Sequence, residues 1–86
     1  MKKISVIGIG KLGLCFALTL EKAGYSVLGL DINPEYVNKV NKRTLKSDEQ
    51  GVEESLKASS NFKATLSLEE AVNFSNYYML LLQLHH

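Results

Sequence analysis

The chain has 86 residues, of which 45% are hydrophobic and 22% are charged. These values are typical of one globular domain and not of a disordered or membrane-embedded chain. Ten basic residues against nine acidic ones give a net charge of +1 with no basic block, which excludes nucleic acid and anionic membranes as the expected partners.

A strand, a glycine cluster and a helix are expected at the start of the chain. The apolar run Ile4–Ile9 has the composition of a strand that is covered on both faces. Lys11–Ala23 carries apolar residues at helical spacing, and Gly24 is placed to end that helix as a C-cap glycine. The residues expected along its apolar stripe are Leu12, Cys15, Phe16, Thr19, Leu20 and Ala23.

A second strand and a second helix follow. Ser26–Leu30 is a short apolar run that ends at Asp31. Asn33 is suited to the N-cap of the next helix, Pro34 to its first position, and Glu35 complements the positive end of its dipole. The residues expected to be buried on this helix are Tyr36, Val37 and Val40.

The second half of the chain continues the alternation of helices and strands. We expect a polar loop over residues 44–50, a short helix around Val52–Ala58, a strand at Phe62–Thr65, a helix from a Ser67/Glu70 capping box to Phe74, and a last strand at Tyr77–Leu82. Such alternation gives right-handed crossovers and a parallel sheet. The predicted fold class is α/β, a Rossmann-like half with about four strands in the order 3-2-1-4 and helices on both faces.

Three glycines stand where the first strand passes into the first helix. In the pattern G-x-G-x-x-G, Gly8 permits the tight turn, Gly10 lets the backbone approach a pyrophosphate, and Gly13 lets the helix pack closely on the strand. The helix N-terminus adds free N–H groups and about half a positive charge. The spacing therefore predicts a phosphate-binding loop.

Asp31 lies at the end of the second strand, where the adenosine ribose of a dinucleotide would arrive. A carboxylate there accepts hydrogen bonds from the ribose hydroxyls and repels a 2′-phosphate, and Ile32 and Asn33 supply no arginine to welcome one. NAD is therefore predicted in preference to NADP. The competing interpretation is that the glycines only form a turn and that Asp31 is a solvated residue.

The other candidate residues are assigned to structure. Cys15 is expected as a small core residue and Tyr36 as a packing residue, whereas Lys11 is expected either over the phosphates or in solvent. His85 and His86 would need a third metal ligand and are interpreted as a frayed end or a tag remnant. No acid/base pair or activated nucleophile is recognisable, so no catalytic residue and no metal site is predicted.

The run KISVIGIGKLGLCFALTLEKAGYSVLGLDINPEYVNKVN resembles the N-terminal NAD-binding segment of the UDP-glucose/GDP-mannose (nucleotide-sugar) dehydrogenases. DEQGVEESL at 48–56 and FKATLSLEEAV at 62–72 are similar to later segments of the same family, so the resemblance covers residues 2 to about 82. It implies a parent enzyme that oxidises the C6 alcohol of a nucleotide sugar to a carboxylate with NAD. It also implies that the catalytic cysteine, lysine and aspartate lie beyond residue 86.

The cofactor-binding residues follow from the resemblance and from the loop pattern together. The family positions are Gly8, Gly10, Lys11, Leu12, Gly13 and Asp31, and the neighbouring positions Ile9, Ile32 and Asn33 complete the expected set. The sequence departs from the family at Tyr36, where a basic residue is frequent, at Gln50, where a proline is usual, and at residues 82–85, where a Val-x-Thr-Pro segment is expected. We therefore expect binding of NAD or of its ADP-ribose part.

The resemblance also frames the expected partners and the alternatives. Residues 1–86 are expected to be a partial NAD-binding domain, truncated after the fourth strand, that is not catalytic alone and meets the nucleotide sugar only within the full-length parent. An exposed final strand predicts self-association. One cysteine and no signal sequence predict a cytoplasmic protein. The alternatives are a nucleotide-sensing module of the kind that gates potassium transport and another β-hydroxyacid-type dehydrogenase, and both are disfavoured by the 48–56 segment.

Overall fold

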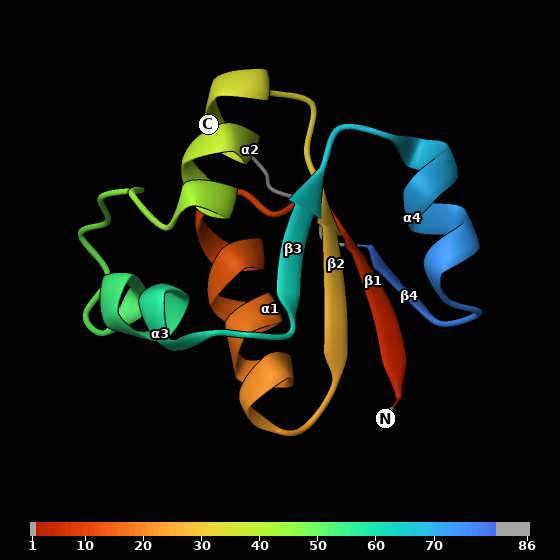
Figure 1. Ribbon diagram of the computed structural model, residues 1–86, viewed down its shortest axis with the longest axis horizontal. Coiled ribbons are helices and arrows are strands. Elements are labelled where there is room, and N and C mark those ends of the chain that lie inside the picture. The colour runs from red at the N-terminus through yellow and green to blue at the C-terminus, as the bar shows by residue number, and fades with distance from the viewer. Residues whose placement is uncertain (1, 81–86) are drawn as a thin grey trace.

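A parallel four-stranded sheet with the strand order β3-β2-β1-β4 forms the centre of the computed structural model, which describes residues 2–80 (Figure 1). The elements are β1 (Lys3–Ile7), α1 (Lys11–Lys22), β2 (Ser26–Leu30), α2 (Pro34–Lys42), α3 (Val52–Ala58), β3 (Phe62–Thr65), α4 (Leu68–Phe74) and β4 (Tyr78–Leu80). The predicted fold class and strand order are therefore confirmed.

The helices divide unequally between the two faces of the sheet. Helices α1, α2 and α3 lie on one face and α4 lies on the other (Figure 1). The first face carries the larger core, in which Val6 and Val27 of the sheet pack with Leu14 of α1 and Val40 of α2. The core beneath α4 is small and consists of Leu28, Leu30 and Ala71, with Ile7 and Phe74 packed beside them.

A buried serine joins the sheet to the lone helix on its second face. The hydroxyl of Ser5, which is fully buried in β1, donates a hydrogen bond to the carbonyl of Ala71 at 2.6 Å. A buried hydroxyl without a partner would destabilise the fold by roughly 1–3 kcal/mol. The contact therefore lets a polar residue occupy a strand that is covered on both faces.

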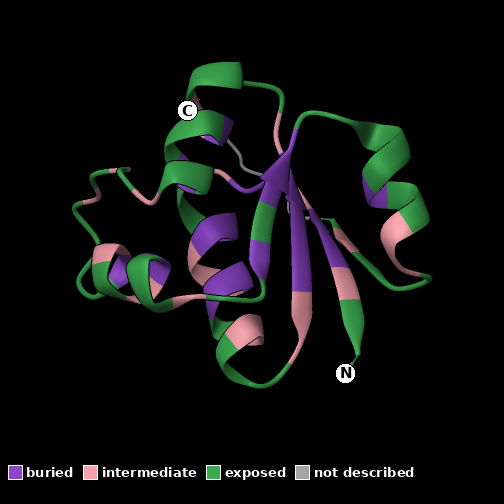
Figure 2. Cartoon of the chain, in the orientation of Figure 1, coloured by how far each residue is buried: buried purple, intermediate pink, exposed green. Residues whose placement is uncertain are grey.

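Helix α1 buries a different stripe from the predicted one. Gly13, Leu14, Ala17 and Leu18 are buried against the sheet, whereas Leu12 is 64% exposed (Figure 2). Thr19 and Ala23 are also exposed, and Cys15, Phe16 and Leu20 are only half-buried. The helix is apolar on most of its circumference, so spacing alone does not select the face. The small residues Gly13 and Ala17 do, because they permit the closest approach to the strands.

Two further predictions need correction at the ends of elements. Strand β1 ends at Ile7 and not at Ile9, because Gly8 turns the chain with a φ of 92°. The capping box is half formed: the Ser67 hydroxyl accepts the Glu70 N–H at 3.0 Å, but the Glu70 carboxylate accepts from the Thr65 hydroxyl instead of from Ser67. In a complete capping box the Glu70 carboxylate would accept the Ser67 N–H, but here the Thr65 hydroxyl is its donor.

The remaining predicted elements are confirmed within the described residues. The Asn33 side chain accepts the Tyr36 N–H at 3.1 Å as the N-cap of α2, and Gly24 follows α1 with a φ of 105°. The last strand begins at Tyr78 and not at Tyr77 as predicted. It is described only to Leu80, so residues 81 and 82 of its predicted range, like residues 83–86, lie outside the described residues. Within residues 2–80, no helix has the length and apolar character needed to cross a membrane.

The two edges of the sheet differ in how their backbone groups are used. Alternate residues of β3 bond β2, so the backbone groups of Phe62 and Ala64 face away from the sheet. Asn41 of α2 donates to the Ala64 carbonyl at 2.9 Å and accepts its N–H at 2.8 Å, and Arg43 donates to the Phe62 carbonyl at 2.7 Å. In the part of the chain that the structure describes, no side chain covers the outer edge of β4 in this way. Within residues 2–80, the β3 edge is therefore closed and the β4 edge is open.

Candidate functional site

The glycine loop places the start of α1 at the carboxyl edge of the sheet. The Gly8 N–H donates to the Leu30 carbonyl at 2.8 Å, which fixes the loop against the end of β2. The first α-helical bond runs from the Leu14 N–H to the Gly10 carbonyl at 2.7 Å, and Gly10 forms the N-cap without a side-chain bond. No acidic residue lies in the first turn. The N–H groups of this turn therefore precede the helical ladder and are suited to an anion.

Asp31 lies at the same edge of the sheet as the glycine loop. Its N–H donates to the Thr65 carbonyl at 3.1 Å, and its carboxylate accepts the Asn33 N–H at 3.1 Å. Since β1 and β2 are parallel neighbours with Ile7 opposite Leu30, the loop and the carboxylate follow directly from adjacent strand ends. The structure thus brings together the two parts that the sequence predicts to bind phosphate and ribose.

The other predicted cofactor residues occupy this edge with different degrees of exposure. Ile32 is 91% exposed, whereas Ile9 is fully buried. The Asn33 side chain is engaged as a helix cap. The Lys11 ammonium lies 3.6 Å from the Glu49 carboxylate, and both side chains are largely exposed. Lys11 thus has a partner in the loop after α2, although exposed pairs contribute little stability.

Tyr36 is the functional candidate that sequence reasoning missed. Expected only to pack, it donates a hydrogen bond from its hydroxyl to the Ile9 carbonyl at 2.5 Å. Burial, the negative charge of Asp31 and then Cys15 raise the pKa of Tyr36 to about 12. The hydroxyl therefore keeps its proton and remains a donor at neutral pH. No local pattern could have found this contact, because the two residues are 27 positions apart.

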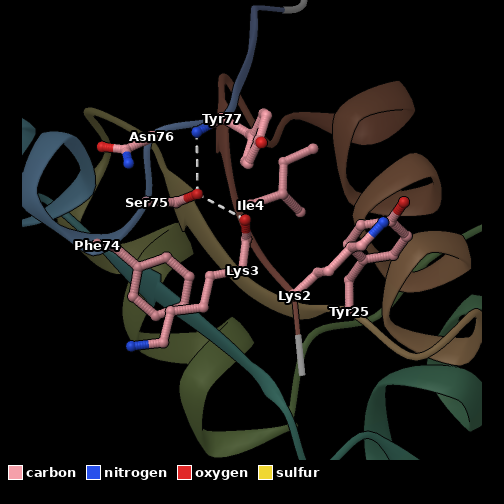
Figure 3. Close-up of a pocket in the computed structure, with 8 residues that line it drawn as sticks. All are labelled: Lys2, Lys3, Ile4, Tyr25, Phe74, Ser75, Asn76 and Tyr77. Atoms are coloured by element: carbon pink, nitrogen blue, oxygen red, sulfur yellow. Dashed lines mark hydrogen bonds between the residues drawn. The ribbon is translucent and has the colours of Figure 1, made fainter.

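A cavity of about 530 Å³ lies away from this edge, at the amino ends of the strands (Figure 3). Within it the Ser75 hydroxyl donates to the Lys3 carbonyl at 2.5 Å and accepts the Tyr77 N–H at 3.0 Å, while the Lys3 ammonium lies 5.3 Å from the centre of the Phe74 ring. The polar groups of Ser75, Lys3 and Tyr77 that line this cavity thus already have partners within the protein. Ligands of parallel α/β sheets bind outside the carboxyl ends of the strands. The carboxyl edge that carries the glycine loop, called the glycine edge below, therefore remains the candidate site.

A smaller cavity of about 220 Å³ adjoins the candidate site. Its lining includes Lys11, Leu14 and Tyr36 together with residues 45–48 of the loop after α2. Across residues 2–80, no group of three His, Cys, Asp or Glu side chains is arranged to hold a metal ion. The two histidines that raised the question of a metal lie outside the described residues.

Comparison with known families matches nearly the whole chain to one NAD-binding domain. Residues 2–82 match the profile of the "UDP-glucose/GDP-mannose dehydrogenase family, NAD binding domain". The chain is 40% identical over 77 residues to a UDP-N-acetyl-D-mannosamine dehydrogenase of Methanococcus maripaludis, covering 86% of this chain and 18% of that protein. It is 33% identical over 78 residues to a glycerol-3-phosphate dehydrogenase [NAD(P)+] of Acholeplasma laidlawii, covering 91% of this chain and 22% of that one.

Solved structures give the same fold. A UDP-glucose dehydrogenase from Pyrobaculum islandicum superposes with a TM-score of 0.84 at 30% identity, over 93% of this chain and 19% of that one. A GDP-mannose dehydrogenase from Pseudomonas aeruginosa, crystallised as a ternary complex, superposes with a TM-score of 0.86 at 24% identity, over 93% and 19% of the two chains, which shows the shared fold. The chain thus spans about a fifth of the length of these relatives.

Proposed function

The chain belongs to the UDP-glucose/GDP-mannose dehydrogenase family through that family's NAD-binding domain, and from this premise we propose that its glycine edge holds the ADP-ribose part of NAD. The observation that carries the proposal is the hydrogen bond between the Gly8 N–H and the Leu30 carbonyl, which joins the glycine loop to the end of β2, directly before Asp31. An uncapped helix start and a carboxylate on adjacent strand ends fit a pyrophosphate and a ribose.

Each predicted residue has a defined part in this proposal. The amides of Gly10, Lys11 and Leu12 receive the pyrophosphate, and the buried Gly13 lets α1 approach the sheet. The Asp31 carboxylate accepts the ribose hydroxyls, and residues 32–33 adjoin the adenosine. The Asn33 side chain caps α2, so this residue contributes mainly through its backbone.

We assign the catalytic step to a longer parent chain. NAD supplies a hydride acceptor when bound, and the parent uses it to oxidise the C6 alcohol of a UDP- or GDP-sugar to a carboxylate. Three of the four relatives named above are dehydrogenases of UDP-N-acetyl-D-mannosamine, UDP-glucose and GDP-mannose, and these names support a nucleotide sugar as the substrate class. Residues 1–86 then form part of the NAD-binding domain and do not turn over the sugar alone.

A nucleotide-sensing module of the potassium-transport kind is not favoured. The first 40 residues fit both classes, but the family match continues from residue 2 to residue 82 and includes the segments at 48–56 and 62–72. The choice therefore depends on the second half of the domain and not on the glycine loop.

Calorimetric titration with NAD, ADP-ribose and NADP tests the cofactor proposal. We expect NAD and ADP-ribose to bind with similar affinity and NADP to bind about tenfold or more weakly, because Asp31 repels the 2′-phosphate. Asp31→Ala should weaken NAD and reduce the preference over NADP. Glu54→Ala, which removes an exposed carboxylate of α3, is the matched control and should change neither. A preference for NAD that survives Asp31→Ala would contradict the assigned role of this carboxylate.

The proposal extends to partners and location. We place self-association at the open edge of β4, where Tyr78 is 47% and Leu80 is 63% exposed, because the opposite edge is closed by Asn41 and Arg43. The location proposed is the cytoplasm, in keeping with the single cysteine, Cys15, among these 86 residues.

A further inference from the structure

Tyr36 connects the two parts of the candidate site. It lies in the first turn of α2, five positions after Asp31, and its hydroxyl reaches back across the end of the sheet to the carbonyl of Ile9. The backbone N–H of Tyr36 is itself held by the Asn33 cap at 3.1 Å. One residue of the ribose-binding segment thus holds the backbone of the phosphate loop.

Ile9 is fixed from its side chain as well as from its carbonyl. Its side chain is fully buried over Gly29 of β2, and a Cβ atom at position 29 would lie only 2.6 Å from Ile9 Cγ2. Gly29 therefore provides the space into which Ile9 packs. With the side chain in this space and the carbonyl bonded to Tyr36, Ile9 has little freedom to rotate.

The fixed carbonyl determines the direction of the next N–H group. The peptide between Ile9 and Gly10 is planar and trans, so the Gly10 N–H points opposite to the Ile9 carbonyl. Within residues 2–80 no acceptor takes the Gly10 N–H. Gly10 is also the N-cap of α1, so this donor lies beside the first-turn amides.

We propose that Tyr36 is a positioning residue, which orients the Ile9–Gly10 peptide so that the Gly10 N–H is directed at the pyrophosphate of a bound dinucleotide. The inference rests on the proposed function and deepens it. The residue acts without touching the ligand, because its hydroxyl is used by the protein. The loop is thus ordered by an uncharged donor, the Tyr36 hydroxyl.

A matched pair of tyrosine variants tests the inference. Tyr36→Phe removes the bond to the loop, and Tyr78→Phe removes a similar bond, of 2.6 Å, from a tyrosine hydroxyl to the Val72 carbonyl away from the site. Each protein is titrated with ADP-ribose and with adenosine by NMR. We expect Tyr36→Phe to weaken ADP-ribose about three- to tenfold and to leave adenosine unchanged, since adenosine carries no phosphate. Tyr78→Phe should leave both affinities unchanged.

The outcomes separate this inference from the proposed function. Unchanged ADP-ribose affinity in Tyr36→Phe, or an equal loss for adenosine, would show that Tyr36 has only a packing role. If the unaltered chain binds no ADP-ribose, the proposed function fails. Whether Tyr36 orders the Ile9–Gly10 peptide is then tested on the protein without ligand. Amide order parameters from ¹⁵N relaxation should fall at Ile9 and Gly10 in Tyr36→Phe but not in Tyr78→Phe, and unaltered order there would overturn it.

Discussion

Tyr36 shows how one side chain can join two segments that are distant in sequence. Glycine spacing and an acidic residue at a strand end predicted the loop and Asp31, because both signals are local. The bond from Tyr36 to Ile9 could not be predicted, since it depends on the closure of α2 over the strand ends. The packing of Ile9 into the space over Gly29 could not be predicted either, because it too depends on the tertiary fold.

The ionisation of Tyr36 provides a prediction at the scale of the residue. Burial, the charge of Asp31 and Cys15 raise its pKa to about 12, from an ordinary value of 10.0. A group with a raised pKa contributes stability that is fully present below its unfolded pKa and is lost as the pH rises through its folded pKa. We therefore expect stability to fall between pH 10 and about 12 through this group.

Difference measurements between the unaltered chain and Tyr36→Phe check this prediction. Absorbance titration of tyrosinate should show that the variant has lost the tyrosine that ionises near pH 12. Denaturant unfolding should show a shallower loss of stability above pH 10 in the variant. If the ionisation that disappears in Tyr36→Phe lies instead near the ordinary tyrosine pKa of 10.0, Tyr36 is solvated and does not hold the loop.

Helix starts were predicted correctly where they depend on residues within one turn of the boundary. The start of α2 was predictable from Asn33 and Pro34, whose capping and backbone preferences act within one turn. The buried stripe of α1 was not, because an almost wholly apolar helix offers several faces to the sheet. Packing of Gly13 and Ala17 against the strands makes that choice, and packing is not a local property.

Asn41 gives a prediction at the scale of the element. Its side-chain amide makes two hydrogen bonds to the backbone of Ala64 and so closes the outer edge of β3. Asn41→Ala would leave this N–H and carbonyl without these partners, so we expect a loss of about 1–3 kcal/mol in the free energy of unfolding. Urea denaturation measures it. Asn38→Ala, at an exposed position of the same helix, should leave stability unchanged or raise it slightly, because alanine has the higher helix propensity, and an equal loss in both variants would contradict edge closure as the cause.

The whole molecule is a sheet with unequal cover and unequal edges. Three helices protect one face, whereas α4 alone protects the other, and the β4 edge is open in the described residues (Figure 2). The strand order was predictable because parallel strands alternating with helices allow few topologies. The closure of only one edge was not, since it depends on the distant pairs Asn41–Ala64 and Arg43–Phe62.

The open edge predicts concentration-dependent association. We expect sedimentation velocity to show a larger species at increasing concentration, and Leu80→Lys to shift the chain toward the monomer, because a charge on an edge strand opposes strand addition. Leu68→Lys is the matched control, since Leu68 is 61% exposed against 63% for Leu80 but lies on α4. A chain that stays monomeric throughout, or equal effects of the two changes, would place any association elsewhere.

The central claim is that the carboxyl edge of the sheet, and not the cavity at its amino edge, binds the cofactor. An NMR titration of the amide-labelled chain with NAD tests it most directly. The account predicts chemical-shift changes concentrated in residues 8–13 and 31–33, with Tyr25 and Phe74 of the other cavity unaffected. Changes centred on Tyr25 and Phe74, or no change at saturating NAD, would contradict it.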